Sequence, residues 1–281
     1  GPVLIDIPKD ILNQKSDWIE PGPLELPGYK PTLDPNPKMI QQAANLIKNS
    51  KKPILYVGGG IIHSKANKEL FDLATKFNIP VVTTLMGRGA FPDGHELCLE
   101  MPGMHGNYTA TTSIQKSDLL IAIGVRFDDR VTANPSFFAQ NAKVIHADID
   151  PAEIGKVREA QVPIVGDAKS VILGLIDALQ DEELDTKNWI NELNSMKTEH
   201  PLSYNQDENG PLKVPFVLEE LQDLTEEGAI VVSGVGQHQM WISQHWNFTE
   251  PNTWLNSGGL GTMGYSLPAA IGAKTAYPEK L

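Results

Sequence analysis

The sequence predicts an α/β protein with a doubly wound, parallel sheet and partial α/β domains on either side of it. Strand-like apolar runs alternate with amphipathic helical segments from residue 36 to residue 180, and the strand runs are apolar along their whole length. Glycine-rich or charged loops follow these runs. Such alternation indicates parallel strands, and continuously apolar strands indicate a sheet that is covered on both faces.

The first segment, residues 1–10 (GPVLIDIPKD), is predicted to be a strand, and no neighbouring strand follows it closely. We interpret it as the last strand of a preceding domain; the alternative is a strand that joins the next sheet. Residues 11–35 are predicted to form a linker, because they carry five prolines between Pro21 and Pro35 and show little periodicity.

The elements of residues 36–180 follow in regular order. Asn36 and Pro37 are expected to begin a helix as its N-cap and first-turn residue, and Asp167 is expected to cap the last helix. Between them the apolar periodicity predicts two more helices and four strands. The helices contain residues 70–77 and 107–116, and the strands span residues 52–57, 79–85, 119–125 and 143–149.

The rest of the chain is predicted to hold a linker and the start of a further domain. Residues 181–212 are acidic, polar and interrupted by proline, with one helix around Trp189. A second α/β unit follows, with a helix at 215–224, strands at 229–233 and 253–256, and a final helix of small residues. This unit is too short to close a core of its own, so we interpret it as truncated.

Composition excludes several classes of protein. The net formal charge of −12 argues against a general affinity for nucleic acid or for anionic membranes. The single cysteine, Cys98, excludes a disulfide framework and a cysteine-based zinc site. The apolar runs are shorter than the roughly 18 residues that span a bilayer, and neither zinc-type histidine spacing nor a G-x-S-x-G elbow is present.

Glycines and charged residues follow four of the predicted strands, where open parallel sheets bind their ligands. They lie at residues 58–60, 84–87, 124–128 and 148–150. Glycine amides and Arg126 suit a pyrophosphate, and a carboxylate suits a ribose or an adenine, so the mixture favours a nucleotide. The alternative is that the glycines only end strands, that His105 is a structural histidine, and that residues 128–130 form a solvated turn.

Two further glycine-rich loops, residues 234–240 and 257–265, follow the strands of the second unit. The first presents Gln237 and His238 at the edge of a sheet. Loops without a function are the alternative, but two such loops at neighbouring strand ends favour a second ligand site.

Several segments together resemble the catalytic large subunits of the acetohydroxyacid synthases, or acetolactate synthases, which are thiamine-diphosphate enzymes. The matching segments are GPVLIDIPKD, MPGMHG (101–106), GVRFDDRVT (124–132), HADIDPAEI (146–154), GVGQHQMW (234–241) and SGGLGTMGYSLPAAIGA (257–273). The resemblance implies four parts: the end of the pyrimidine-binding domain with a linker (1–35), the central FAD-associated domain with a six-stranded parallel sheet (36–180), a linker (181–212) and the start of the diphosphate-binding domain (213–281).

The activity that the resemblance implies is decarboxylation of pyruvate on thiamine diphosphate and transfer of the hydroxyethyl group to pyruvate or 2-ketobutyrate. This chemistry belongs to the biosynthesis of valine, leucine and isoleucine, and herbicides target the family. Implied cofactors are thiamine diphosphate, Mg²⁺ and FAD. Implied partners are further full-length subunits, in a homodimer or homotetramer, and a small regulatory subunit. The implied compartment is the bacterial cytoplasm, or a plastid or mitochondrion in a eukaryote.

The resemblance also assigns residues to each ligand. Flavin contacts are expected at Gly58, Gly59, Gly60, Thr84, Leu85, Met86, His105, Gly124, Arg126, Asp128, Asp148 and Ile149. Thiamine diphosphate contacts are expected at Val235, Gly236, Gln237, His238, Gln239, Met240, Gly258, Gly259, Gly261 and Met263. Asp129 and Arg130 are expected to line the substrate channel.

Two departures from the family pattern limit what this stretch of chain can do. The glutamate motif that activates thiamine and the GDG…N motif that binds magnesium are both absent. No catalytic residue and no metal ligand are therefore assigned, and the chain alone is expected to be inactive. Two other functions stay open: another thiamine-diphosphate-dependent decarboxylase or carboligase, and a nucleotide-binding regulatory module.

Overall fold

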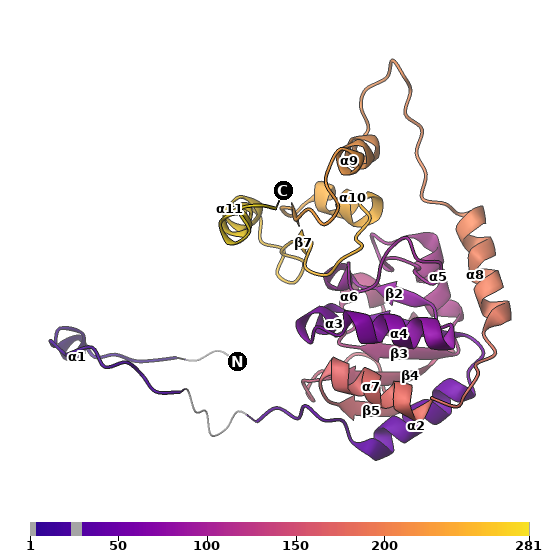
Figure 1. The fold of residues 1–281 in the computed structure, drawn as a ribbon, viewed down its shortest axis with the longest axis horizontal. Helices are drawn as coiled ribbons and strands as arrows, with labels where there is room; N and C mark the ends of the chain where they lie inside the picture. The colour runs from indigo at the N-terminus through magenta and orange to yellow at the C-terminus, as the bar shows by residue number, and fades with distance from the viewer. Residues whose placement is uncertain (1–3, 24–29, 281) are drawn as a thin grey trace. The chain divides into compact units, whose positions relative to one another are not determined.

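The computed structural model describes residues 4–23 and 30–280, and the chain divides into two compact units, Gly1–Pro31 and Thr32–Leu281. In the first unit, residues 4–8 form no strand and Lys9–Leu12 is a short helix, α1 (Figure 1). The strand predicted at residues 1–10 is therefore wrong from residue 4 onward, and residues 1–3 lie outside the described part.

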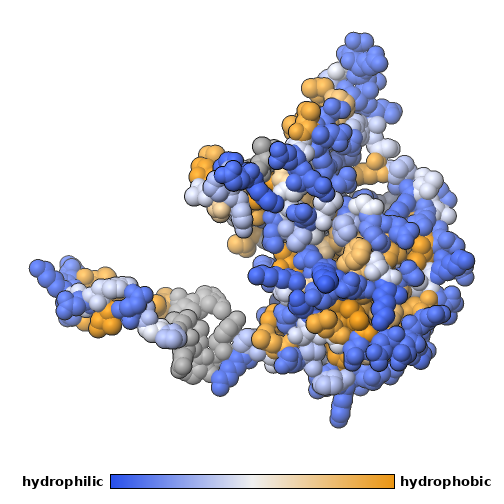
Figure 2. Space-filling model, viewed as in Figure 1, coloured by the Kyte–Doolittle hydropathy of each residue, from blue (hydrophilic) through white to orange (hydrophobic). Residues whose placement is uncertain are grey.

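The missing strand has a physical reason. No described strand pairs with residues 4–8, and an isolated strand leaves its backbone N–H and C=O groups without partners. Leu4, Ile5 and Trp18 of this unit are exposed. Figure 2 shows hydrophobic residues on the surface of this unit.

The second unit contains the predicted parallel sheet. Among the described residues it has five strands where six were predicted, so the α/β class is confirmed and the strand count is corrected. The strands lie in the order β2 (Val81–Thr83), β1 (Pro53–Val57), β3 (Leu119–Ile123), β4 (Lys143–Asp148) and β5 (Val162–Val165), and all neighbours are parallel.

Helices cover both faces of this sheet, as a doubly wound fold requires (Figure 1). Leu55 and Val57 of β1 point into one core, and Ile54 and Tyr56 point into the other. The first core is closed by α2 (Pro37–Lys48), α3 (Gly59–His63), α4 (Asn67–Phe77) and α7 (Ala168–Ala178). The second core is closed by α5 (Tyr108–Lys116) and α8 (Lys187–Glu199).

The helix expected around Trp189 is a structural part of this second core. Trp189 is 1% exposed, and its indole Nε1–H donates to the carbonyl of Pro53 in β1 at 3.1 Å. The first half of the predicted 181–212 connection is therefore packed against the sheet.

Side-chain caps begin several helices where the sequence indicated. Asn36 accepts a hydrogen bond from the Lys38 amide at 2.9 Å, and Asp167 accepts one from the Lys169 amide at 3.0 Å. Both predicted N-caps are confirmed. A capping side chain satisfies one of the N–H groups that the first helical turn leaves free.

The last part of the second unit has the element types that the sequence predicted. It comprises α9 (Val214–Asp223), β6 (Val231–Val232), α10 (Gln237–His245), β7 (Trp254–Leu255) and α11 (Ser266–Ala276), and β6 pairs with β7 in parallel. Ile242, Phe248 and Trp254 form its small core. No helix in the described part of the chain combines the length and hydropathy that crossing a bilayer demands.

Candidate functional site

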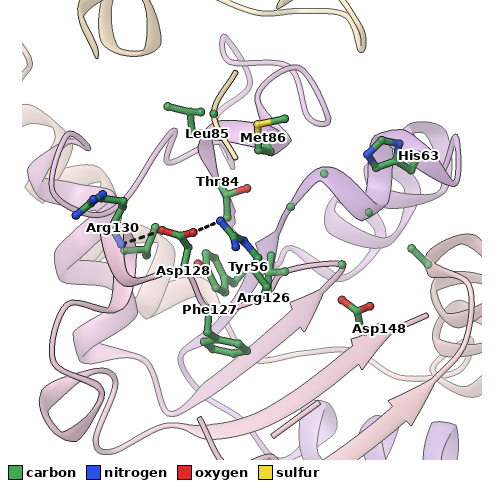
Figure 3. A pocket seen from close by; sticks show the side chains of 18 of the residues that line it. Tyr56, His63, Thr84, Leu85, Met86, Arg126, Phe127, Asp128, Arg130 and Asp148 are labelled. Atoms are coloured by element: carbon green, nitrogen blue, oxygen red, sulfur yellow. Dashed lines mark hydrogen bonds and ion pairs between the residues drawn. The ribbon is translucent and has the colours of Figure 1, made fainter. Parts of the chain in front are cut away.

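A cavity of about 830 Å³ opens at the carboxyl ends of the sheet (Figure 3). The chain passes from β1 to β2 on one side and then to β3 on the other, so the strand order reverses at β1. This reversal leaves a crevice between the connections that follow β1 and β3, which is where ligands bind in open α/β sheets. The cavity lies at this crevice, and residues of the C-terminal part form another of its walls.

The structure brings most of the predicted site residues together around this cavity. All those expected to contact flavin line it: Gly58, Gly59, Gly60, Thr84, Leu85, Met86, His105, Gly124, Arg126, Asp128, Asp148 and Ile149. The residues from the other two predicted sets that also line it are Val235, Gly236, Gln239, Met240, Gly258, Gly261 and Arg130.

Five predicted residues lie outside the cavity lining: Gln237, His238, Gly259, Met263 and Asp129. All five are exposed, and the exposed fraction of Met263 reaches 79%. Gln237 and His238 occupy the first turn of α10. Any ligand that they contact therefore approaches from the solvent side of this loop.

The structure adds lining residues that were not predicted as ligand contacts. Val125, Phe127 and Ser257 lie within loops that the sequence had indicated. The others are Tyr56, His63, Ser64, Val131, Ala147, Gly166, Asp167 and Ala168. Gly166 and Asp167 follow β5, a strand that was not predicted, and the V-P-I-V run before them was the available signal. Tyr56 is the one aromatic residue in a strand that otherwise contains proline and aliphatic residues. Its hydroxyl group could have indicated a place near the site.

Two of the three glycines after β1 are required by backbone packing. A Cβ atom at Gly58 would lie 2.4 Å from the Gly124 oxygen, and one at Gly60 would lie 2.6 Å from the Gly124 Cα. Their amides donate to the carbonyls of Ile123 and Gly124, both at 3.2 Å. Gly59 differs, because its added Cβ would meet nothing closer than 3.4 Å and its amide makes no hydrogen bond within the described residues.

Arg126 and Asp128 form an ion pair in the connection that follows β3. The Asp128 carboxylate also accepts from the Arg130 amide at 3.0 Å and caps the short helix α6 (Asp129–Thr132). Phe127 between them has a φ of +53°, a conformation that non-glycine residues seldom adopt. The turn buries Phe127 and leaves the Arg126 side chain 59% exposed. Strain of this kind is often found at functional sites.

His146 of β4 holds the same connection in place through a hydrogen bond. It is fully buried, its Nε2–H donates to the Val125 carbonyl at 2.9 Å, and its Nδ1 accepts from the Gly155 amide at 3.3 Å. This pattern requires a neutral imidazole with its proton on Nε2. Burial lowers the pKa of His146, which favours that neutral form.

Asp148 brings a carboxyl group to the cavity from the end of β4. Partial burial raises its pKa, and a hydrogen bond from the Asp150 amide at 2.9 Å acts in the opposite direction. Asp148 can therefore accept hydrogen bonds from hydroxyl or amino groups in the cavity.

The C-terminal part closes the cavity by direct contact with the central sheet's connections. Gln244 in α10 donates to the His105 carbonyl at 2.7 Å. Gly258 lies so close to the turn η1 (Leu85–Gly87) that an added Cβ would be 2.2 Å from a Leu85 methyl group. The first contact holds α10 against His105, and the second places the loop after β7 against Leu85 and Met86.

A buried ion pair joins the same two parts. Arg88 and Asp93, whose side chains are 2% and 1% exposed, form two hydrogen bonds of 2.7 Å. Asp93 also accepts from the Phe248 amide at 2.6 Å, and its own amide donates to the Phe248 carbonyl at 3.2 Å. The Arg88 guanidinium lies 5.6 Å from the centre of the Phe248 ring. The pair therefore binds residues of the C-terminal part to the loop that follows η1.

The described residues contain no group of three or more histidine, cysteine, aspartate or glutamate side chains that could hold a metal ion.

Comparisons with known proteins match the two parts of the second unit to two families. Residues 40–175 match the family described as thiamine pyrophosphate enzyme, central domain. Residues 234–281 match the family described as thiamine pyrophosphate enzyme, C-terminal TPP binding domain.

Individual relatives align along nearly the whole chain. An acetolactate synthase of Mycobacterium leprae is 53% identical over 99% of this chain and 45% of the relative. The acetolactate synthase large subunit of Corynebacterium glutamicum is 51% identical over 100% of this chain and 45% of its own. Chloroplastic acetolactate synthase 1 of Nicotiana tabacum is 46% identical, with 100% and 43% covered. The chain thus spans less than half the length of these relatives.

Proposed function

Because this chain is a homologue of acetolactate synthase large subunits and carries thiamine pyrophosphate enzyme domains, we propose that it serves the formation of acetolactate. The reaction is decarboxylation of pyruvate and transfer of the hydroxyethyl group to pyruvate or to 2-ketobutyrate. Its products feed the biosynthesis of valine, leucine and isoleucine. The observation that carries the proposal is the identity of about half of the residues along both domains.

We propose FAD as the ligand of the cavity. A volume of about 830 Å³ lies within the range of cofactor sites, which is roughly 300–1,000 Å³. Arg126 would bind the pyrophosphate as a charge-assisted donor, and Asp148 would accept from ribose or adenine groups. Gly59 would allow close approach to its free amide, and Leu85 and Met86 would cover apolar rings. In this proposal FAD is bound without taking part in electron transfer.

Thiamine diphosphate would be bound at the carboxyl ends of β6 and β7. When bound, it supplies the electron sink that decarboxylation needs. Gly236, Gln237 and His238 would orient it from the start of α10. Gly261, whose φ of +67° suits glycine, would let its loop approach closely, and the exposed Met263 would pack against the cofactor. No step is assigned to Mg²⁺.

Assembly and compartment are also proposals. Helix α11 buries none of its side chains, and Leu267 and Ile271 on it are 70% and 60% exposed. An apolar surface of this kind supports association with further subunits, as a homodimer or homotetramer, and with a small regulatory subunit. The bacterial relatives favour a bacterial cytoplasm, and the tobacco relative favours a plastid in a eukaryote.

Arg126 provides the test of the flavin site. In the 281-residue chain, Arg126→Ala should weaken FAD binding by about 1.5–3 kcal/mol, the range for a hydrogen bond to a charged group. Arg126→Lys should weaken it too, since lysine lacks a planar two-point contact. Lys156→Ala, which removes an exposed cation outside the cavity lining, should leave the affinity unchanged. Flavin fluorescence titration measures all three, and equal affinity of every variant and wild type would contradict the assignment.

A genetic experiment tests the proposed reaction. Disruption of the gene that encodes this chain should lower acetolactate formation from pyruvate in cell extracts, measured as acetoin after acid decarboxylation. Growth should then need valine, leucine and isoleucine, and the reintroduced wild-type gene should restore both properties. Unchanged acetolactate formation in the disrupted strain would refute the proposal.

A further inference from the structure

The side chain of Tyr56 is buried in the protein, and yet its hydroxyl has no hydrogen-bond partner among the described residues. Tyr56 lies on β1 and lines the cavity, beside Arg126 and Asp128 (Figure 3). The neighbouring strand residues Leu55 and Val57 are aliphatic and fully buried, so the phenol brings a polar atom to an apolar strand.

Packing alone does not explain the oxygen atom. The Tyr56 ring contacts the Phe127 ring edge to face, with centroids 5.6 Å apart, and a phenylalanine ring would make the same contact. A buried hydroxyl without a partner costs free energy that phenylalanine at this position would not cost. The hydroxyl therefore indicates a function in the cavity.

The surroundings make this hydroxyl a neutral donor. Burial, with a further contribution from the negative charge of Asp128, raises the pKa of Tyr56, so the group stays protonated across the ordinary pH range. The Asp128 carboxylate is already engaged by the Arg126 guanidinium and the Arg130 amide. The Tyr56 hydroxyl therefore has no acceptor among the described residues.

We propose that Tyr56 is a ligand-binding residue whose hydroxyl donates a hydrogen bond to an acceptor atom of the flavin nucleotide. The inference rests on the proposed flavin site and adds to it a residue that lies within a strand. Rotation about the C–O bond lets the hydroxyl hydrogen turn toward an acceptor. The same atom gains its missing partner only when the ligand is bound.

The test compares Tyr56→Phe with wild type in the 281-residue chain. FAD affinity, measured by flavin fluorescence, should fall about fivefold, the value for one neutral hydrogen bond. Where the acceptor belongs to the isoalloxazine ring, the absorption spectrum of the bound flavin should shift as well, because the chromophore loses a donor. Without ligand, the thermal midpoint of Tyr56→Phe should equal or exceed that of wild type, since the substitution removes an unpaired buried hydroxyl.

Tyr204→Phe is the matched control. The Tyr204 hydroxyl lies outside the cavity lining and donates to the Glu219 carboxylate at 2.5 Å. This variant should keep the wild-type FAD affinity and flavin spectrum. The control therefore shows whether an effect on FAD binding comes from the Tyr56 hydroxyl in particular or from removal of any tyrosine hydroxyl.

The outcomes are distinct. Wild-type affinity and spectrum in Tyr56→Phe, with FAD bound by wild type, would overturn the role of Tyr56 and leave the flavin site standing. A lower thermal midpoint of the ligand-free variant would also overturn it, because the hydroxyl would then serve folding. Absence of FAD binding by wild type would refute the flavin site and this inference together.

Discussion

The ion pair between Arg88 and Asp93 should be essential for the attachment of the C-terminal part. Both side chains are almost completely buried, and Asp93 makes five polar contacts. Its partners are two guanidinium nitrogens, the Cys98 thiol, and the Phe248 N–H and C=O groups. Burial raises the pKa of the Asp93 carboxyl, and the positive charge of Arg88 opposes this rise. Removal of either partner leaves an uncompensated polar group in the interior.

Arg88→Met and Asp93→Asn should each lower the free energy of unfolding by about 3–5 kcal/mol, the range for breaking a buried pair. The double variant should lose less than the sum, because methionine fills the space without a charge and asparagine still accepts from the Phe248 amide. Urea unfolding followed by circular dichroism measures these values, and hydrogen exchange at Phe248 reports the attachment itself.

An exposed ion pair gives the comparison. Lys51 and Asp185 are 67% and 68% exposed, so Lys51→Met should change the free energy of unfolding by less than about 1 kcal/mol. If Arg88→Met changes it no more than Lys51→Met does, the buried pair does not hold the C-terminal part. Strict additivity of the two buried substitutions would likewise refute the reasoning.

Two further predictions concern the connections around the cavity. Gly60→Ala should destabilise the protein by about 1–3 kcal/mol, because its Cβ would meet the Gly124 backbone. Gly59→Ala should change the stability little. Thermal unfolding measures both variants, and equal midpoints would contradict the steric argument. Burial lowers the pKa of His146, so the unfolded chain binds a proton that the folded chain does not. Stability should therefore fall as the pH drops below about 6.5, by up to roughly 1.4 kcal/mol per pH unit. His146→Gln should reduce this slope while the exposed His200→Gln keeps it, and identical slopes in all three proteins would exclude His146 as the source.

The gathering of the strand ends could be predicted from sequence, because parallel strands place their carboxyl ends at one edge of a sheet. That rule alone brought residues 58–60, 124–128 and 148 to one cavity. It failed where a strand itself was missed. β5 is four residues long, and its Pro163 is exposed, so it lacks the continuous apolar run of an inner strand.

Other features depend on tertiary contacts that no local pattern contains. Arg88 and Asp93 sit in a loop with no periodicity, and the Phe248 amide that Asp93 accepts from is 155 residues further along the chain. Gly58 and Gly60 also depend on a tertiary contact. Their place after a strand predicted amides that bind a ligand. Their amides are used by the protein because the connection after β3 passes so close to them.

The cavity is lined by residues of both parts that the Phe248 contact joins, between Tyr56 and Ala168 in one part and between Val235 and Gly261 in the other. A nucleotide that touches both walls binds only to the docked arrangement, so its apparent dissociation constant is the intrinsic value divided by the docked fraction. Linkage is reciprocal, and the bound nucleotide strengthens docking by the same factor. Weakening the Arg88 pair should thus lower nucleotide affinity although Arg88 lines no part of the cavity.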